Sequence, residues 1–262
     1  MQRPSNGAER LSVRKVLTAV SAFDIHYPET DFPTWNAILD FVGRNRVGLF
    51  VLGGDNLHCE SISHHTKGKP KFKNLGQMKR ELDGFRRHIL DPLERVLPPR
   101  CEKVWLTGNH EDWLEQMYEE QPELAGLIDF AEYLGLAARG WTVKRQGGHF
   151  KKGHLKWIHG DVLSGGHIQK ALNTYVENIV YGHFHTSASG TKILPHTKKH
   201  KWQAWAMGCV GRLDSGYLKK RPTGWLNQLG ITEFRKGGFF NHYPVTVFGG
   251  RFSFGGKLYG RR

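Results

Sequence analysis

Cysteines and long apolar runs are scarce in this sequence of 262 residues. Its three cysteines, Cys59, Cys101 and Cys209, are far apart and form no CxxC pair, which argues against a disulfide framework and against a zinc ribbon. No window approaches the roughly 18 to 20 consecutive apolar residues of a membrane-spanning helix. Residues 1–10 are polar and lack the apolar segment of a signal peptide. We therefore expect a cytoplasmic protein that is neither secreted nor embedded in a membrane, with residues 1–10 as a flexible tail.

Positive charge is abundant, with a formal net charge of +14 at pH 7. It favours a polyanionic partner or substrate such as DNA or RNA, although a basic surface can also serve solubility alone. Basic runs at 67–73, 198–201 and 219–221 could neutralise backbone phosphates. The sequence identifies no protein partner. Aromatic residues that could stack on bases lie in or near these runs, namely Phe72, Trp202, Trp205, Tyr217 and Trp225.

The order of expected elements indicates one α/β domain over residues 1–262. Helices alternate with strands in the first half, and short strands separated by glycines dominate after residue 141, which fits two packed sheets. The charged stretch 56–74 is too long for a tight connection and is expected to be a basic loop. The strands expected in the first half are 13–22, 47–52 and 103–106, and the helices are 33–44 and 75–97.

Five short segments share one layout, in which an apolar strand runs directly into polar side chains that can bind metals. Sites in open α/β sheets gather where strands reach their carboxyl ends, so we expect these segments to lie together. Glycines beside the polar residues allow sharp turns and close approach of the backbone. The segments are Asp24-Ile25-His26, Gly54-Asp55-Asn56, Gly108-Asn109-His110-Glu111, His159-Gly160-Asp161 and Gly182-His183-Phe184-His185.

The residue types in these segments are those of a metal site. Carboxylate oxygens and imidazole nitrogens suit Mn, Fe, Zn, Ni or Co, and the absence of thiolates argues against a structural zinc site. In Asp-x-His and His-x-His, side chains two residues apart on an extended segment point to one side and can reach one metal region. A carboxylate can bridge two ions about 3.5 to 4 Å apart, the separation used in two-metal hydrolysis.

In order and residue pattern, these motifs resemble those of the calcineurin-like metallophosphoesterase superfamily, which are D-x-H, G-D, G-N-H-[DE], H and G-H-x-H. The resemblance spans about residues 13–185. The segment 108–113 and the aromatic, basic C-terminal region are most similar to phosphoesterases encoded by bacteriophages and prophages. The resemblance implies a four-layer α/β/β/α sandwich of two mixed sheets flanked by helices. It also implies a metal-dependent phosphoric ester hydrolase, which we expect in the cytoplasm of a bacterium or a phage-infected host cell.

The resemblance further implies two divalent metal ions, for which Mn is our first expectation and Fe, Zn, Ni, Co or Mg are alternatives. Asp55 would bridge the two ions. One ion would bind Asp24, His26, Asp55 and His185, and the other would bind Asp55, Asn109, His159 and His183.

Catalysis in such a site would use the two cations and one further histidine. The cations would lower the pKa of a shared water, and the resulting hydroxide would attack phosphorus in line. His110 would bind no metal and would act as general acid or stabilise the leaving oxygen. Other polar residues have less defined roles. Glu111, Asp112 and Asp161 are interpreted as groups that orient the ligating imidazoles, and His58, His64 and His65 as substrate contacts or exposed loop residues.

The substrate class is narrowed by two arginines that the motifs lack. Protein phosphatases of the superfamily extend the second and third motifs with arginines, whereas this chain has His58 and Cys59 after Asn56-Leu57, and Thr107 before Gly108. Together with the basic charge, this favours a phosphodiesterase or nuclease acting on DNA or RNA. The alternatives are a phosphomonoesterase or cyclic-nucleotide phosphodiesterase acting on small substrates, and a non-catalytic metal-binding protein, which the complete ligand set disfavours.

Overall fold

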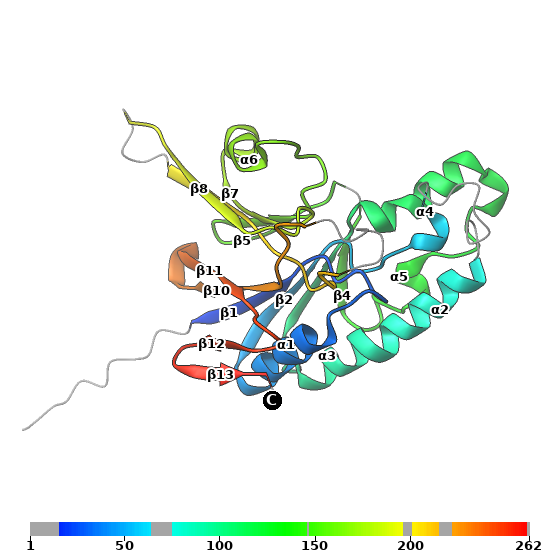
Figure 1. Cartoon of the computed structure of the whole chain (residues 1–262), viewed down its shortest axis with the longest axis horizontal. Helices are drawn as coiled ribbons and strands as arrows, with labels where there is room; N and C mark the ends of the chain where they lie inside the picture. Colours follow the sequence, from blue (N-terminus) through cyan, green and yellow to red (C-terminus); the bar gives the residue numbers. More distant parts are fainter. Residues whose placement is uncertain (1–15, 64–74, 146, 196–200, 215–221, 261–262) are drawn as a thin grey trace, which may run out of the picture.

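Two mixed β-sheets lie face to face, and helices cover the outer face of each (Figure 1). The structure is a computed structural model that describes residues 16–63, 75–145, 147–195, 201–214 and 222–260. Several predicted segments lie outside the described residues, namely the tail at 1–10, the basic runs at 67–73 and 219–221, and residues 198–200 of the basic run at 198–201.

The larger sheet has six strands in the order β11-β10-β1-β2-β3-β4. Strands β1 to β4 are parallel, and β10 and β11 extend the sheet antiparallel at one edge. Strand β2 is apolar and almost wholly buried, as expected for a central strand covered on both faces. The strands are β1 (Leu17–Ala22), β2 (Val47–Gly53), β3 (Glu102–Leu106), β4 (Trp141–Lys144), β10 (Gln228–Phe234) and β11 (Phe240–Thr246).

The smaller sheet has five strands in the order β5-β6-β7-β9-β8. Strands β6, β7 and β9 are parallel, and β5 and β8 form antiparallel edges. These strands are β5 (Phe150–Lys152), β6 (Leu155–Ile158), β7 (Asn178–Tyr181), β8 (Ala188–Ile193) and β9 (Lys201–Ala206). A C-terminal hairpin, β12 (Phe252–Phe254) and β13 (Lys257–Tyr259), packs beside the first helix.

Helix α1 (Phe32–Arg44) begins where its sequence predicts. The Asp31 carboxylate accepts the Thr34 N–H at 2.8 Å, and Pro33 stands in the first turn. None of the helices in the described residues has the length and apolar character needed to cross a lipid bilayer. The other helical segments are η1 (Glu60–Ile62), α2 (Leu75–Phe85), η3 (Arg86–Leu90), α3 (Asp91–Val96), α4 (Asn109–Glu120), η4 (Pro122–Leu124), α5 (Phe130–Tyr133), α6 (His167–Tyr175) and η6 (Lys236–Gly238).

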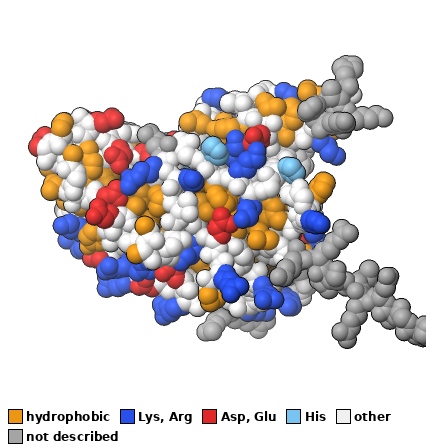
Figure 2. Space-filling view, turned by 180° about the vertical axis from the view of Figure 1, so that it is seen from behind, with side chains coloured by type: hydrophobic (Ala, Val, Ile, Leu, Met, Phe, Trp, Pro, Cys, Tyr) orange, Lys and Arg blue, Asp and Glu red, His pale blue; other side chains and the backbone are white. Residues whose placement is uncertain are grey.

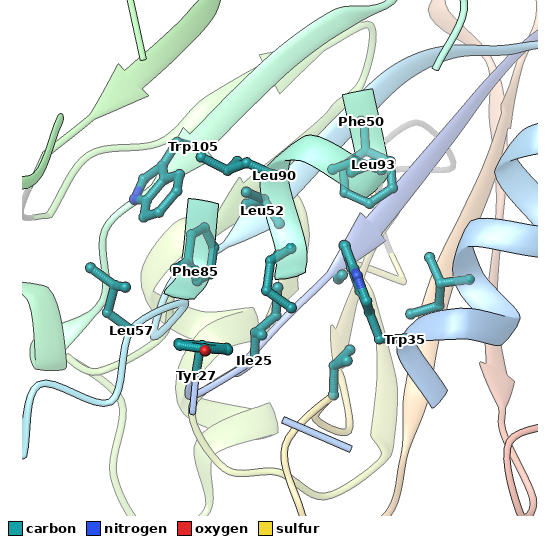
Figure 3. Packing of buried hydrophobic residues seen from close by; sticks show 14 of the residues in the cluster. Ile25, Tyr27, Trp35, Phe50, Leu52, Leu57, Phe85, Leu90, Leu93 and Trp105 are labelled. Atoms are coloured by element: carbon teal, nitrogen blue, oxygen red, sulfur yellow. The ribbon is translucent and has the colours of Figure 1, made fainter. Parts of the chain in front are cut away.

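Three apolar cores follow from the alternation of side chains along the strands. On β2, Leu49 and Val51 face the core between the two sheets, while Phe50 and Leu52 face the core beneath the helices (Figure 3). A third core joins Ile179 of β7 to the inner side of α6. The layers are therefore helices, sheet, sheet and helix, which confirms the predicted α/β/β/α sandwich.

The structure differs from the sequence prediction at four places. Instead of one regular helix at 75–97, the chain forms α2, a π-helical turn η3 and α3 in succession. Helix α6 and the short edge strand β5 were not predicted, because the segments that form them are short and lie among glycines. The long loop predicted at 56–74 contains the short helix η1, and its residues 64–74 lie outside the described residues.

Candidate metal centre

The predicted ligands lie at the carboxyl ends of strands from both sheets. Three of these strands, β1 to β3, belong to the larger sheet, and β6 and β7 belong to the smaller one. The candidate site therefore forms where the two sheets meet. In chain order, Asp24 and His26 follow β1, Asp55 follows β2, Asn109 follows β3, His159 follows β6, and His183 and His185 follow β7.

The middle residues of the Asp-x-His and His-x-His motifs, Ile25 and Phe184, anchor their neighbours. Ile25 is fully buried in the core beneath the helices (Figure 3), while Asp24 and His26 on either side of it turn towards each other at the site. Phe184 stacks on the His167 ring of α6 with centroids 4.0 Å apart. The apolar residue of each motif thus fixes the segment that carries two polar ligand candidates.

Five of the predicted ligands have a left-handed backbone conformation, which is uncommon for residues other than glycine. Their φ angles lie between 47° and 71°. Among the described residues, only Cys59 and Val176 are further non-glycine residues with positive φ. Strained backbone of this kind persists where surrounding structure enforces it, and it concentrates at functional sites. The five ligands are Asp24, His26, Asp55, His183 and His185.

Two glycines let the ligand segments approach each other. A Cβ atom on Gly108 would lie 2.2 Å from Asp55 Oδ1, and one on Gly182 would lie 2.3 Å from Asp24 Oδ2. No side chain fits at either position without moving a carboxylate of the site. These glycines therefore act through close approach, as their place beside the motifs predicts.

A first group of potential ligands consists of Asp24, His26 and His185, all of them buried. The Nε2 atom of His185 lies 3.1 Å from His26 Nε2 and 3.3 Å from Asp24 Oδ1. The Asp24 carboxylate also accepts the His183 N–H at 2.9 Å, which ties the segment after β1 to the segment after β7.

A second group consists of Asp55, His159 and His183. The Nε2 atom of His159 lies 3.3 Å from Asp55 Oδ2 and 3.2 Å from Asn109 Oδ1. Its Nδ1 atom lies 3.2 Å from the Gly53 carbonyl, to which it can donate a proton and so leave Nε2 free as a ligand.

Asp55 stands between the two groups. Its Oδ2 atom lies 3.3 Å from His159 Nε2 in one group and 3.9 Å from His26 Nε2 in the other. The carboxylate is nearly inaccessible to solvent, so its charge is offset by these neighbours rather than by bulk water. This is the position that a bridging ligand requires.

The donor set fits divalent cations. Ligands bound to one ion at about 2.1 Å and at right angles lie about 3 Å apart, close to the separations of 3.1 and 3.3 Å in the first group. In addition, His183 Nδ1 is buried and has no hydrogen-bond partner among the described residues. Carboxylate, amide and imidazole groups can hold Mn, Fe, Zn, Co or Ni, and the residues do not choose among these metals.

The protonation of the buried groups also bears on metal binding. Burial, aided by the neighbouring His110, lowers the pKa of His26 well below its ordinary value, so this imidazole is neutral, as a ligand must be. Burial alone would lower the pKa of His159, but the adjacent Asp55 carboxylate outweighs it and raises that pKa to about 10. A cation that binds His159 Nε2 must therefore displace a proton.

His110 lies beside both groups and is held on three sides. Its backbone N–H donates to Asp55 Oδ1 at 2.9 Å, and the Nδ1 atom of its ring lies 2.7 Å from the His58 carbonyl. Its ring packs on Trp113, with centroids 4.0 Å apart. The remaining nitrogen, Nε2, lies 3.8 Å from Asp55 Oδ2 and thus faces the site.

His58, which the sequence left open as a substrate contact or an exposed residue, lies close to the site. Its ring centroid is 5.7 Å from that of His26 and 5.5 Å from that of His110, and these three histidines form a further group with metal-ligand spacing. His64 and His65 lie outside the described residues.

Glu111 has a different role from the predicted orientation of imidazoles. Its buried carboxylate accepts the backbone N–H groups of Gly108, Asp55, Asn56 and Leu57 at 2.8 to 3.2 Å. Burial raises the pKa of Glu111 to about 8, while the N–H donors act in the opposite direction. Glu111 thus joins the loop of the central carboxylate to the start of α4. For Asp112 and Asp161, orientation of an imidazole stays a prediction.

Two of the aromatic residues proposed to stack on bases are inaccessible. Trp202 is 6% exposed, and its indole N–H donates to the carbonyl of Leu172 in α6. Trp205 is 8% exposed and packs between the two sheets. Trp225, in contrast, lies at the site, with its ring 4.2 Å from that of His185. Phe72 and Tyr217 lie outside the described residues.

Comparison with known proteins gives only distant likenesses. No family model and no curated protein matches the chain. Vacuolar Protein Sorting 29 from Cryptosporidium parvum is 11% identical, with a TM-score of 0.46 over 93% of this chain and 94% of that chain. A 5'-nucleotidase precursor from Thermus thermophilus is 13% identical, with a TM-score of 0.42 over 89% of this chain and 54% of that chain. The nuclease MPE from Pseudomonas putida is 14% identical, with a TM-score of 0.35 and 86% coverage of both chains.

Proposed function

We propose that the chain is a metal-dependent phosphoesterase that holds two divalent cations, with Mn as the first candidate. The observation that carries this proposal is the place of Asp55, whose Oδ2 atom lies within 4 Å of imidazoles from both ligand groups. The first ion would bind Asp24, His26, Asp55 and His185, and the second Asp55, Asn109, His159 and His183. Bound at these positions, the cations would supply an activated water and neutralise charge on the phosphate.

The protein's own residues would perform the remaining steps. With Nδ1 donating to the His58 carbonyl, His110 presents Nε2 to the site, where it can give a proton to the leaving oxygen. Glu111 holds the Asp55 loop against the start of α4, which keeps the central carboxylate and His110 in register. The buried surroundings of Asp24 and Asp55 strengthen every charge interaction made there.

We further propose that the substrate is a phosphodiester of nucleic acid. The net charge of +14 supports a polyanionic substrate. Figure 2 shows Lys and Arg side chains in several separate groups on one face, with Asp and Glu side chains between them. The described residues of this face thus offer scattered phosphate contacts. A bacteriophage or prophage relationship belongs to the same proposal and rests on the segment 108–113 and on the aromatic, basic C-terminal region.

The proposal is tested by metal addition to metal-depleted protein, followed by a substrate panel. The panel compares a nitrophenyl monoester, a bis-nitrophenyl diester, cyclic nucleotides, and single- and double-stranded DNA and RNA. We expect two metal ions per chain and hydrolysis of the diester and of nucleic acid. Preference for the monoester or for cyclic nucleotides would contradict the nucleic-acid substrate, and no hydrolysis with any metal would contradict the activity.

The matched variants are Asp55→Asn and Asp40→Asn. Asp55→Asn should lower turnover by more than about 100-fold and reduce the metal content, since loss of groups that merely support ligands already costs about 10- to 100-fold. Asp40 lies on α1 and pairs with Arg44 at the surface, so its replacement should leave turnover unchanged. Wild-type activity in Asp55→Asn would contradict the central role of this carboxylate.

A further inference from the structure

Glu81 is a buried acid that belongs to none of the metal-site motifs. It stands on α2, only 7% exposed, within the apolar face formed by Met78, Leu82 and Phe85. Its Oε1 atom accepts two backbone N–H groups, those of His58 and Cys59, each at 2.8 Å. An acid at such a position in an apolar helix face requires partners, and here the partners come from the loop that follows β2.

The backbone that Glu81 holds is not in a relaxed conformation. Cys59 has a φ of 51°, in the left-handed region, and precedes the short helix η1. Two hydrogen bonds to one carboxylate oxygen fix this bend at His58 and Cys59. The His58 N–H also donates to the Tyr27 carbonyl at 2.9 Å, but the Cys59 N–H belongs to the same planar peptide group as the His58 carbonyl, so its bond to Glu81 helps to set the direction of that carbonyl.

That carbonyl is the acceptor for His110. His110 Nδ1 lies 2.7 Å from it, and this contact sets both the tautomer and the direction of the ring. A chain of contacts thus runs from Glu81 through the His58–Cys59 backbone to His110 Nδ1, and across the ring to Nε2 beside Asp55 Oδ2. This is one route by which α2 reaches the centre of the site.

We propose that Glu81 is a positioning residue that aims His110 Nε2 at the leaving oxygen, and that the site is thereby built for phosphodiesters whose leaving group is an unactivated alcohol, such as a sugar hydroxyl. This rests on the proposed function, since it requires hydrolysis of a phosphoester. As the water oxygen bonds to phosphorus, the bond from phosphorus to the leaving oxygen breaks, and its electron pair goes to the leaving oxygen. The oxygen takes the proton from His110 Nε2, and Nδ1–H remains bonded to the His58 carbonyl.

The chemistry of the leaving group provides the discriminating measurement. A nitrophenolate leaves readily without a proton, whereas a sugar alkoxide leaves slowly unless an acid protonates it. Loss of correct aim at His110 should therefore slow an alkyl diester such as a dinucleotide much more than a bis-nitrophenyl diester. A residue that only stabilises the fold would slow both substrates alike.

Three variants separate these outcomes. Glu81→Ala removes the acceptor and should lower dinucleotide turnover about 10- to 100-fold, part of the effect of a general acid, while nitrophenyl diester turnover changes less than about 3-fold. Glu81→Gln keeps a carbonyl oxygen for both N–H groups and should restore most of the dinucleotide activity. Met78→Ala removes buried packing from the same helix without touching these hydrogen bonds, and should leave the ratio of the two activities at the wild-type value.

A second readout needs no catalysis. In metal-free protein, NMR of labelled histidine should show the hydrogen-bonded Nδ1–H of His110 in wild type and Glu81→Gln, and its loss or upfield shift in Glu81→Ala. An equal fall of both activities in Glu81→Ala, the same ratio change in Met78→Ala, or an unchanged His110 signal would overturn the proposal. If the wild type hydrolyses no phosphoester, the proposed function fails, and the NMR result still decides whether Glu81 positions His110.

Discussion

His110 touches the candidate site without belonging to the two ligand groups that contain Asp24 and Asp55. This separation allows its role to be isolated by mutation. His110→Ala should keep both metal ions and lower turnover of an alkyl diester by about 10²- to 10⁴-fold, the usual contribution of a general acid. Metal analysis and steady-state kinetics measure the two effects. The control is His154→Ala, which replaces an exposed histidine directly before β6. Unchanged turnover in His110→Ala would rule out the acid role.

Burial of His242 leads to a prediction about how the free energy of unfolding depends on pH, independent of the metal site. It lies on β11, 9% exposed, with Nδ1 2.8 Å from the Thr232 hydroxyl. Burial lowers the pKa of His242 to about 3, whereas the unfolded chain takes up this proton at about pH 6.5. The unfolded state binds more protons between these two pH values. The contribution of neutral His242 to the free energy of unfolding is therefore complete above pH 6.5 and is lost as the pH falls towards 3.

The size of this loss can be measured against a variant that does not titrate. At pH 5 the loss should be about 2 kcal/mol, from roughly 1.36 kcal/mol per pH unit. His242→Asn can still accept the Thr232 hydroxyl. Its free energy of unfolding should therefore fall less than that of wild type between pH 7 and pH 5, by about that difference. Urea unfolding of metal-free protein tests this, and parallel pH curves would exclude His242 as the cause.

At this scale, the sequence predicted which side chains meet but not how the backbone holds them. Residues such as Asp55 and His159 follow strands in a recognisable order, so their convergence could be predicted. The role of Glu81 could not, because its partners are two N–H groups in a loop some twenty residues earlier. A sequence feature that could have drawn attention to Glu81 is its place among apolar residues at helical spacing. The prediction that Trp205 could stack on bases was wrong, because the lysines near it in the sequence do not reveal that this strand residue faces the core.

Among the elements, the segment from α2 to α3 departs most from its predicted form. Apolar spacing at 75–97 indicates a helix, but it cannot show that η3 widens one turn into a π-helix. This turn carries His88, whose Nδ1 lies 2.9 Å from the hydroxyl of Tyr27, the residue after His26. The unusual turn therefore contacts the segment that supplies two predicted ligands.

Gly84, one turn before that contact, gives a test in which two effects have opposite signs. Gly→Ala within a helix usually stabilises by about 1 kcal/mol. Here the new Cβ would lie 2.2 Å from the Tyr27 hydroxyl, and the Tyr27 ring belongs to the buried core, with its centroid 6.0 Å from that of Phe85 (Figure 3). Gly84→Ala should therefore destabilise by about 1 to 3 kcal/mol, the usual range for overpacking.

Thermal unfolding measures this effect, and a second substitution examines its cause. Tyr27→Phe removes the closest atom, so Gly84→Ala should be less harmful in that background. The next ring atoms would still lie 2.8 Å from the new Cβ, so the relief should be partial. A stabilising Gly84→Ala would show that the helix and Tyr27 move apart more easily than the packing indicates.

For the whole molecule, two packed sheets could be predicted from local patterns, whereas the full α/β/β/α layer order was implied by the family resemblance. Strands that alternate between two apolar faces, such as β2, require cover on both sides, and the early helices and late strands supply it. The pairing of β1 with β10 could not be read locally, because it joins segments about 200 residues apart, such as Leu17 and Phe234. The candidate site lies at the carboxyl ends of strands from both sheets.

That location predicts how metal removal affects the entire fold. Asp24, Asp55 and Asn109 come from the larger sheet, and the three later histidines of the site come from the smaller one, so bound cations would link the sheets. Without cations, Asp24 and Asp55 remain buried, and among the described residues neighbouring imidazoles and N–H groups offset their charge. A metal at 100 times its Kd should stabilise the folded state by about 2.7 kcal/mol per site.

Calorimetry with and without a chelator tests this link. The midpoint of thermal unfolding should fall when the metals are removed, and re-adding Mn should restore it. Asp55→Asn should show a much smaller difference, whereas Asp40→Asn, on the outer helix α1, should behave as wild type. Hydrogen exchange adds the spatial detail, because chelation should speed exchange at the carboxyl ends of β1 and β2 and also of β6 and β7. Faster exchange in one sheet alone would mean that the cations bind to that sheet without joining it to the other.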